Sequence, residues 1–301
     1  MALAKARPGP AERRSFPLSG VKGTLDLIRR WPVLPIAVLT VLVVAAIFAP
    51  LLAPRDPTKD SLRESLTPPA WYAQGTTKFL LGTDDVGRDI FSRIIFGARI
   101  SLMVSSVAVV TGLLAGVTLG MISGYYGGWL DEVILRIVDI WLAIPFILFA
   151  LVVTAIFGQS IEIVIGLMAA LAWSAFVRNT RAEVLVLKQM DYVKMAKVVG
   201  ASPTRIMLRH ILPGVINTAI VITTLRVGQL ILAEASLSFL GAGIPDPNPA
   251  WGVMVASGRD FLAIGWWISF FPGAAIFLVV MSMNFLGDWL RDYFDPRLRQ
   301  L

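Results

Sequence analysis

The sequence predicts an all-α integral membrane protein with six transmembrane helices, on two observations. First, the chain of 301 residues is 56% hydrophobic and only 16% charged, with a mean hydropathy of +0.73. A soluble protein of this length would need far more polar surface to cover itself. Second, the apolar runs are long enough to span a bilayer as helices, and they lack the roughly ten-residue alternation that is typical of a transmembrane barrel.

Each predicted span is one long apolar run. At about 1.5 Å rise per residue, each run approaches the roughly 30 Å thickness of a hydrocarbon core. Three runs are interrupted: Pro145 should bend the third, Glu162 lies near the start of the fourth, and Arg226 lies within the fifth. The six spans are residues 33–52, 100–122, 140–157, 161–177, 215–232 and 264–286.

The distribution of Lys and Arg predicts the orientation. Residues 1–31 hold seven and residues 178–210 hold seven, whereas residues 244–263 hold only Arg259. Because cytosolic loops are enriched in these residues, we expect both termini and the 178–210 loop in the cytosol. Residues 55–99 also carry seven, yet the number of spans places them outside. Six acids accompany them, and long loops translocate with little regard to charge.

Charge and cysteine usage exclude several classes of protein. In a soluble protein the net charge of +7 would indicate nucleic-acid binding, but here we attribute it to loops that face anionic lipid and cytosol. The chain has no cysteine, so disulfides and thiolate metal sites are excluded. The first apolar run is longer than that of an ordinary signal peptide and no clear A-x-A cleavage site follows it, which predicts an uncleaved anchor.

The second span carries four glycines spaced four residues apart, which places them on one face of a helix. Small residues on such a face let another helix approach closely. We interpret the stripe as a packing face, with a direct role in a substrate path as the alternative. The glycines are Gly112, Gly116, Gly120 and Gly124.

Polar residues within the fifth span and just after it predict either a packing contact or a path. Arg226 and Glu234 are eight residues apart, within about 80° of each other on a helix of 3.6 residues per turn. Charges at membrane depth normally face a bundle interior or a wet cavity. They therefore either pair with groups on a partner helix or, together with Gln229, line a polar translocation path.

Residues 191–213, DYVKMAKVVGASPTRIMLRHILP, form a polar and basic segment between two apolar spans. The helix formers before Gly200 predict a short helix over 191–199, which the glycine can end in a left-handed conformation. Ser202 and Pro203 predict the cap and first turn of a second short helix, which extends to Leu212-Pro213, where the proline begins the fifth span. This helix–glycine–helix bend is suited to docking in a protein groove; an amphipathic helix lying on lipid is the alternative.

The same segment resembles the cytosolic "EAA" loop of ABC importer membrane subunits. Lys194-Met195-Ala196, followed after three residues by Gly200 and later by Leu212-Pro213, has the spacing of that loop. The first two positions of the triplet are Lys and Met here, and His210 replaces the usual Ile. Both departures resemble the variant found in peptide-importing members.

Other stretches resemble dipeptide and oligopeptide permeases. They are LLGTDDVGRDIFSRIIFGARISL (80–102), EASLSFLGAGIPDPNPAWGVM (234–254) and NFLGDWLRDYFDPRLR (284–299), and LTPPAW (66–71) is most like the dipeptide type. The resemblance covers roughly residues 32–299. It implies the type I ABC importer permease fold and the second-type (C-type) subunit of the peptide/nickel family.

The resemblance also implies an organisation for the whole chain. A cytosolic tail (1–31) precedes the first transmembrane helix (32–54) and a periplasmic loop (55–98). An ABC transmembrane type-1 domain of five helices (99–288), with its coupling loop at about 188–213, precedes a second cytosolic tail (289–301).

The partners implied by the resemblance are a homologous second permease subunit, two ATPase subunits, a periplasmic or lipoprotein substrate-binding protein and membrane lipid. The chain would move dipeptides or short peptides across the cytoplasmic membrane by alternating access. ATP and Mg would be bound by the ATPases and no cofactor by this chain. The residues implied to contact an ATPase are Asp191, Tyr192, Lys194, Met195, Ala196, Gly200, Ala201, Ser202 and Pro203.

One acidic and basic cluster in the predicted outer loop is a further candidate site. Asp84, Asp85, Arg88 and Asp89 either contact the partner subunit or the binding protein, or pack the loop itself.

An enzyme is a poor interpretation of this sequence. No G-x-x-x-x-G-K-[ST] motif is present to cradle ATP phosphates, and no metal-ligand cluster or nucleophile–base pair is evident. The alternatives are a secondary transporter driven by an ion gradient, a membrane scaffold without transport, and an ABC permease for nickel or another small solute. The sequence does not choose among dipeptides, longer peptides, glutathione-like peptides and nickel chelates.

Overall fold

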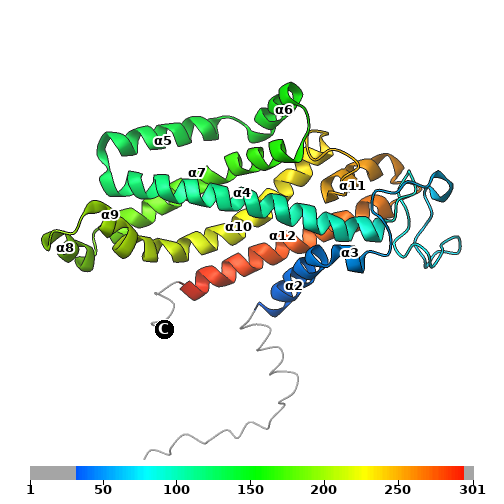
Figure 1. Cartoon of the computed structure of the whole chain (residues 1–301), viewed down its shortest axis with the longest axis horizontal. Coiled ribbons are helices and arrows are strands. Elements are labelled where there is room, and N and C mark those ends of the chain that lie inside the picture. The colour runs from blue at the N-terminus through cyan, green and yellow to red at the C-terminus, as the bar shows by residue number, and fades with distance from the viewer. Residues whose placement is uncertain (1–31, 295–301) are drawn as a thin grey trace, which may run out of the picture.

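The computed structural model describes residues 32–294, and these residues form helices joined by loops, without a β-strand (Figure 1). The helices from the first half of the chain are α2 (Val33–Ile47), α3 (Ala49–Leu52), the 3₁₀ turn Leu62–Glu64, α4 (Ile90–Tyr126), α5 (Gly128–Ala143) and α6 (Phe146–Phe157). Those from the second half are α7 (Ile161–Leu187), α8 (Asp191–Val198), α9 (Pro203–Ile206), the π-helical turn Met207–Ile211, α10 (Leu212–Phe239), α11 (Trp251–Gly258), the 3₁₀ turn Arg259–Phe261 and α12 (Trp267–Phe294). The predicted tail 1–31 and residues 295–301 lie outside the described residues.

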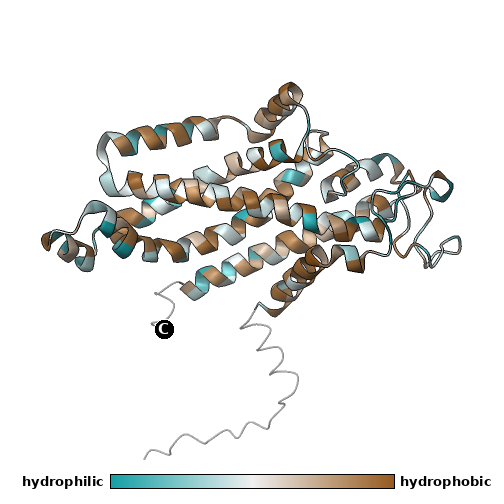
Figure 2. Ribbon diagram, in the orientation of Figure 1, coloured by the Kyte–Doolittle hydropathy of each residue, from teal (hydrophilic) through white to brown (hydrophobic). Residues whose placement is uncertain are grey.

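The long helices run along one common direction, which gives the molecule two ends (Figure 1). We call them the α8 end, where α7 passes into α8, and the loop end, where residues 53–89 and α11 lie. The long helices are mainly hydrophobic, whereas hydrophilic residues gather at both ends (Figure 2). This distribution is the one expected when the bilayer replaces water around the middle of a bundle.

The predicted membrane class is confirmed. Among the described residues, four helices are long and apolar enough to cross a bilayer: α4, α7, the continuous helix Pro203–Phe239, and α12. α5 and α6 pass the same test only as a bent pair, which would be a fifth span if the pair crosses as one, and α2 is a shorter apolar helix of 15 residues. The six predicted segments all overlap these helices, and four of the helices are by themselves long enough to cross a bilayer.

Three of the differences from the sequence prediction bear on the candidate sites. α4 has 37 residues and begins at Ile90, ten residues before the predicted second span, because Asp89 caps it with its side chain. Pro145 does more than bend the third span: α5 and α6 meet at 79°. The residue before a proline is pushed out of the helical region, and Ile144 has the extended ψ of 122° that this predicts.

The third difference concerns the predicted second short helix after Gly200. Pro203 does begin a helix, but this helix continues through the π-helical turn into α10 without a break. Only α8 is therefore a separate short helix, and the second arm of the bend is the first part of a long one. Any motion of α8 would therefore be passed to the helix Pro203–Phe239, which extends along the bundle.

The core has two parts. The larger one is built from α4, α7, α10, α11 and α12, with α2 packed against α4 and α12. The smaller one, the second core, lies at the α8 end, where two buried residues of α8 pack against buried residues of α4, α7 and α10. The second core fixes α8 to the bundle although the helix has only eight residues.

Candidate coupling and translocation sites

The end of α8 is a hydrogen-bonded turn that glycine makes possible. The amide of Ala201 donates to the carbonyl of Ala196, and the amide of Gly200 donates to that of Lys197, both at 3.0 Å. This pair of bonds is the Schellman motif, which needs a left-handed residue just after the helix. Gly200 supplies it with φ of +78°. Ser202 then caps the next helix, its Oγ accepting from the amide of Arg205 at 3.4 Å.

α8 has two faces with opposite environments. On one face, Val193 and Ala196 are buried against the second core. The other face is exposed although much of it is apolar: Met195 is 65% exposed, Val198 83% and Val199 81%. A solvent-facing helix would normally carry polar residues at such positions. The apolar tip, which we define as these three residues, is therefore a surface that no described part of the chain covers.

Two lysines reinforce the attachment of α8 to the bundle. Lys188 Nζ donates to the carbonyl of Gly124 at 2.8 Å, and this carbonyl lies in the last turn of α4. A cation at a helix C-terminus also interacts favourably with the helix dipole. Lys197 lies over the ring of Tyr125, 5.3 Å from its centroid. The predicted coupling segment is thus held firmly on one side, which a force-transmitting element requires.

His210 lies in the π-helical turn that joins α9 to α10. Its Nδ1 is buried and has no hydrogen-bond partner among the described residues. π-helical turns within α-helices are frequent at functional sites. Within residues 32–294 the structure shows no hydrogen bond or ion pair of this histidine, so it assigns the side chain no chemical role.

The glycine stripe of α4 lies directly on α7. A Cβ added to Gly112 would be 2.6 Å from the Cβ of Ala172, and one added to Gly116 would be 2.4 Å from the Cβ of Phe176. Gly120 and Gly124 meet Thr180 and Val184 in the same way, at 2.7 and 2.8 Å. α7 packs against all four glycines, so the structure places the stripe in helix packing within the chain.

The three path candidates on α10 have different environments. Glu234 is only 2% exposed and accepts a hydrogen bond from Ser238 Oγ at 2.7 Å, and Ser238 in turn accepts from the amide of Ile244 at 3.3 Å. Gln229 is exposed and Arg226 is partly buried. No ion pair joins Arg226 to Glu234 in residues 32–294. The side chain of Glu234 is therefore buried inside this subunit, whereas that of Gln229 lies on the surface of the subunit.

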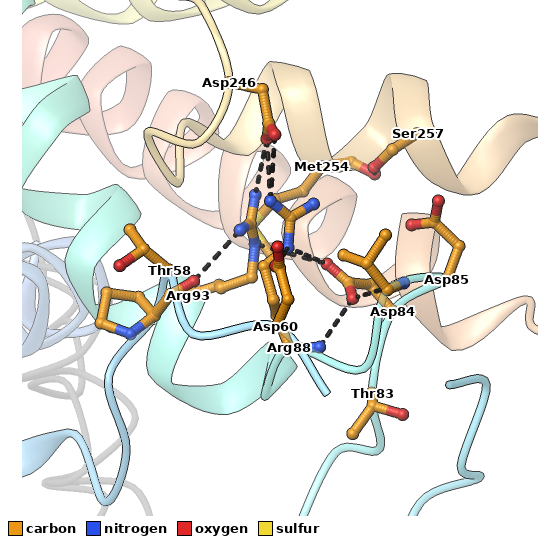
Figure 3. Close-up of polar contacts among 12 residues, drawn as sticks. Thr58, Asp60, Thr83, Asp84, Asp85, Arg88, Arg93, Asp246, Met254 and Ser257 are labelled. Atoms are coloured by element: carbon orange, nitrogen blue, oxygen red, sulfur yellow. Dashed lines mark hydrogen bonds and ion pairs between the residues drawn. The ribbon is translucent and has the colours of Figure 1, made fainter. Parts of the chain in front are cut away.

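At the loop end, two arginines and two aspartates form a charge network in which Asp84, Arg88 and Arg93 are buried and Asp246 is exposed (Figure 3). Arg88 Nε donates to Asp84 Oδ2 at 2.7 Å, and its Nη1 donates to Asp246 Oδ1 at 3.0 Å. Arg93, 1% exposed, adds ion pairs to both aspartates at 3.9 and 3.7 Å and donates to the carbonyl of Pro57 at 3.1 Å. The network joins the 53–89 loop to the loop that follows α10.

The predicted outer cluster is mostly turned inward by this network. Asp84, Arg88 and Asp89 are buried, and Asp89 is the cap of α4, accepting from the amide of Ser92 at 2.9 Å. Burial raises the pKa of Asp85, and the nearby Asp84 charge adds to the effect. Burial lowers the pKa of Arg88, but the charges and hydrogen bonds of Asp84 and Asp246 outweigh it and the net shift is upward.

Sequence analysis missed two members of this network, Arg93 and Asp246. Arg88 and Asp246 are 158 residues apart, so no local spacing could have paired them. It also missed the ion pairs that hold α5 to α7, in which Arg181 Nε meets Asp131 Oδ1 and Arg178 Nη2 meets Asp139 Oδ1, both at 2.5 Å. The usable signal was weak: opposite charges at the edges of apolar runs.

Comparison with known proteins defines the class of this membrane protein. Residues 116–300 match the family model described as the inner membrane component of binding-protein-dependent transport systems. The chain therefore belongs to this family of transport permeases. It is a transporter subunit rather than an enzyme, as the resemblance implied, because this family is the permease part of ABC transporters.

Several curated relatives are similar over most of their length. A dipeptide transport system permease of Haemophilus influenzae is 43% identical over 88% of this chain and 90% of its own. A di/tripeptide permease of Pseudomonas aeruginosa is 41% identical, covering 86% of this chain and 85% of its own. A glutathione transport permease of Pectobacterium atrosepticum is 42% identical, covering 86% and 84%.

One solved structure is similar in fold. A chain of the methionine ABC transporter in inward-facing conformations superposes with a TM-score of 0.54 at 19% identity. It covers 67% of this chain and 97% of the other. The predicted type I ABC importer permease fold is confirmed by this likeness together with the family match.

Proposed function

We propose that the chain is one of two membrane subunits of an ATP-driven importer that moves dipeptides or other short peptides across the bacterial inner membrane. The substrate class is supported by the relatives, whose names give dipeptide, di/tripeptide and glutathione transport at 41–43% identity. Since these identities are nearly equal, they do not favour one of these substrates over the others, and we assign short peptides as a class. A homologous permease would complete the path and a binding protein would deliver the peptide.

In this proposal two ATPase subunits bind ATP and Mg, and one of them docks on α8 and the turn at Gly200. Both termini and the α8 end face the cytosol, as the Lys and Arg distribution predicts. The loop end then faces the periplasm and receives the binding protein. ATP-driven closure of the ATPases would move α8. The helix that begins at Pro203, just after the turn that follows α8, is continuous with α10 and would carry that motion across the bundle.

The observation that carries this proposal is the apolar tip of α8. Three exposed apolar residues lie at the far end of the bundle, on a helix whose opposite face is buried in the second core. A helix anchored on one face can transmit motion from another protein only if that protein binds its exposed face. An ATPase with an apolar surface groove would bind this face, since apolar helix faces dock in such grooves.

Cross-linking tests the docking. The chain has no cysteine, so Val198→Cys introduces its sole thiol. We expect a thiol-reactive photo-cross-linker at this position to capture the co-expressed ATPase in proteoliposomes, more strongly when ATP is present. Leu262→Cys, also exposed but at the loop end, is the matched control and should capture no ATPase.

The transport part is tested in the same proteoliposomes. ATP-dependent uptake of radiolabelled dialanine is expected with the binding protein present. If Val198→Cys captures only lipid analogues in every nucleotide state, α8 lies on the membrane surface and the docking proposal is wrong. Absence of uptake of dialanine and of glutathione by the complete system would contradict the peptide assignment.

A further inference from the structure

A cavity of about 500 Å³ lies between α7, α10 and α12 towards the α8 end. Its volume is within the roughly 300–1,000 Å³ of small-molecule sites. One part of its wall is apolar, formed by Val221, Ile222, Leu225 and Phe294. All the residues that line it lie on these three helices.

The polar part of the wall carries two opposite charges. Glu183 of α7 and Arg291 of α12 both line the cavity. Neither forms a hydrogen bond or an ion pair with another described residue. Glu183 is partly buried, and a carboxylate that loses part of its hydration without a partner is costly. Arg291 is exposed. A carboxylate and a guanidinium at one cavity are suited to a ligand that carries both charges itself.

The cavity wall also carries groups that can bind an amide. Asn179, Asn217 and Thr218 also line the cavity, and their side chains can donate to a carbonyl and accept from an N–H. A free short peptide has the complementary set: an ammonium group, a carboxylate and amide groups between them. Its side chains could rest on the apolar part of the wall, which makes few demands on their identity.

We propose that this cavity binds a short peptide by its two termini, with Glu183 holding the α-amino group and Arg291 holding the α-carboxylate. The choice of peptide as ligand rests on the proposed function. The cavity is a transient binding site at the α8 end, which holds a peptide after it leaves the translocation path and before it is released. It selects for free termini and not for side chains.

The cavity adjoins both the predicted path and the coupling segment. Gln229 lies within about 60° of the helical face of α10 that carries the cavity residues Thr218, Ile222 and Leu225, because these residues recur every three or four positions. A Cβ on Gly214, another lining residue, would be 2.7 Å from Leu187 Cδ1, at the end of α7 that leads into α8. A bound peptide would thus touch the elements that move with α8.

Binding of dialanine to the full-length chain in nanodiscs tests the site directly, because both proposed charged contacts, Glu183 and Arg291, lie on this chain. We expect saturable binding to the unmodified protein. Glu183→Gln should weaken dialanine about tenfold, and Arg291→Gln by a similar factor, the size of one lost charge-assisted hydrogen bond. Glu183→Asp should retain most of the affinity.

Blocked peptides assign each charge to one terminus. Glu183→Gln should not change the already weaker affinity for N-acetyl-dialanine, and Arg291→Gln should not change that for dialanine amide. Glu132→Gln and Arg136→Gln on α5 are matched controls, exposed and outside the cavity, and should bind as the unmodified protein does.

Three results would overturn the inference: no saturable binding, unchanged binding in both cavity variants, or equal weakening for free and blocked peptides. Uptake of dialanine by the complete transporter is measured in parallel. If uptake occurs and any of these results is found, the peptide function stands and the cavity assignment falls. If dialanine binds as expected but the complete system imports no peptide, the site stands and the transport proposal falls.

Discussion

Gly200 is the residue on which the predicted coupling geometry depends most directly. Its φ of +78° is a conformation that only glycine adopts without cost, and apart from its chain neighbours no described residue has an atom within 4 Å of a Cβ placed there. The glycine is therefore required by the backbone turn itself. The space beside it is open, and it would let a docked partner approach the backbone.

Gly200→Val should uncouple the transporter while the protein still inserts in the membrane. A β-branched residue in this conformation costs about 1–3 kcal/mol, which the eight-residue α8 can avoid by reorienting. The measurement is ATPase turnover stimulated by the loaded binding protein, with uptake followed alongside. Gly200→Asn, which tolerates positive φ, is the control and should retain most activity. Stimulated turnover and uptake at normal rates in the valine variant would contradict the role of the turn.

At the scale of elements, the contact between α4 and α7 shows how spacing alone can define an interface. Four glycines at intervals of four residues place a backbone groove along α4, and α7 fills it at Ala172, Phe176, Thr180 and Val184. These residues of α7 also recur every four positions. Close approach of two helices maximises van der Waals contact, which drives helix association where no water is present.

Gly116→Ala should therefore destabilise the protein although alanine favours helices. The added methyl group would meet the Cβ of Phe176 and the carbonyl oxygen of Trp173, at 2.4 and 2.5 Å, and relief of such overpacking costs about 1–3 kcal/mol. Gly166→Ala on α7 is the matched control because nothing lies within 4 Å of its added Cβ. That variant should be neutral or gain up to about 1 kcal/mol. Thermal unfolding in detergent distinguishes them, and equal midpoints would refute the packing role.

At the scale of the whole molecule, the charge network of Asp84, Arg88, Arg93 and Asp246 closes the loop end. Arg88 and Arg93, near the start of α4, hold Asp246 from the loop after α10, and Arg93 also binds the backbone of the 53–89 loop. Three parts of the chain that are far apart in sequence thus meet around two guanidinium groups. A rigid loop end would allow force applied at the α8 end to tilt helices rather than deform loops.

Arg88→Ala should cost about 3 kcal/mol of stability. That is the low end of the range for breaking a buried ion pair, because Asp246 is 57% exposed and Arg93 still compensates part of the charge. The midpoint of thermal unfolding measures it. The same substitution in a background of Asp84→Asn and Asp246→Asn should cost much less, since no carboxylate is then left unpaired. Arg63→Ala, exposed in the same loop, is the control, and an effect equal to that of Arg88→Ala would contradict the network.

The sequence by itself determined the membrane class, the apolar segments, the helix–glycine turn after α8 and the glycine face of α4. These features follow from local properties: hydropathy over about 20 residues, the φ that glycine permits, and the four-residue repeat of a helix. Only the tertiary structure decided that Pro145 breaks a span, that the helix after Gly200 is continuous with α10, and that Glu234 turns inward while Gln229 does not. It alone brought Asp246 to Arg88 and Glu183 to the cavity of Arg291. Pairings across more than a hundred residues depend on how helices pack, and no local pattern in the chain encodes them.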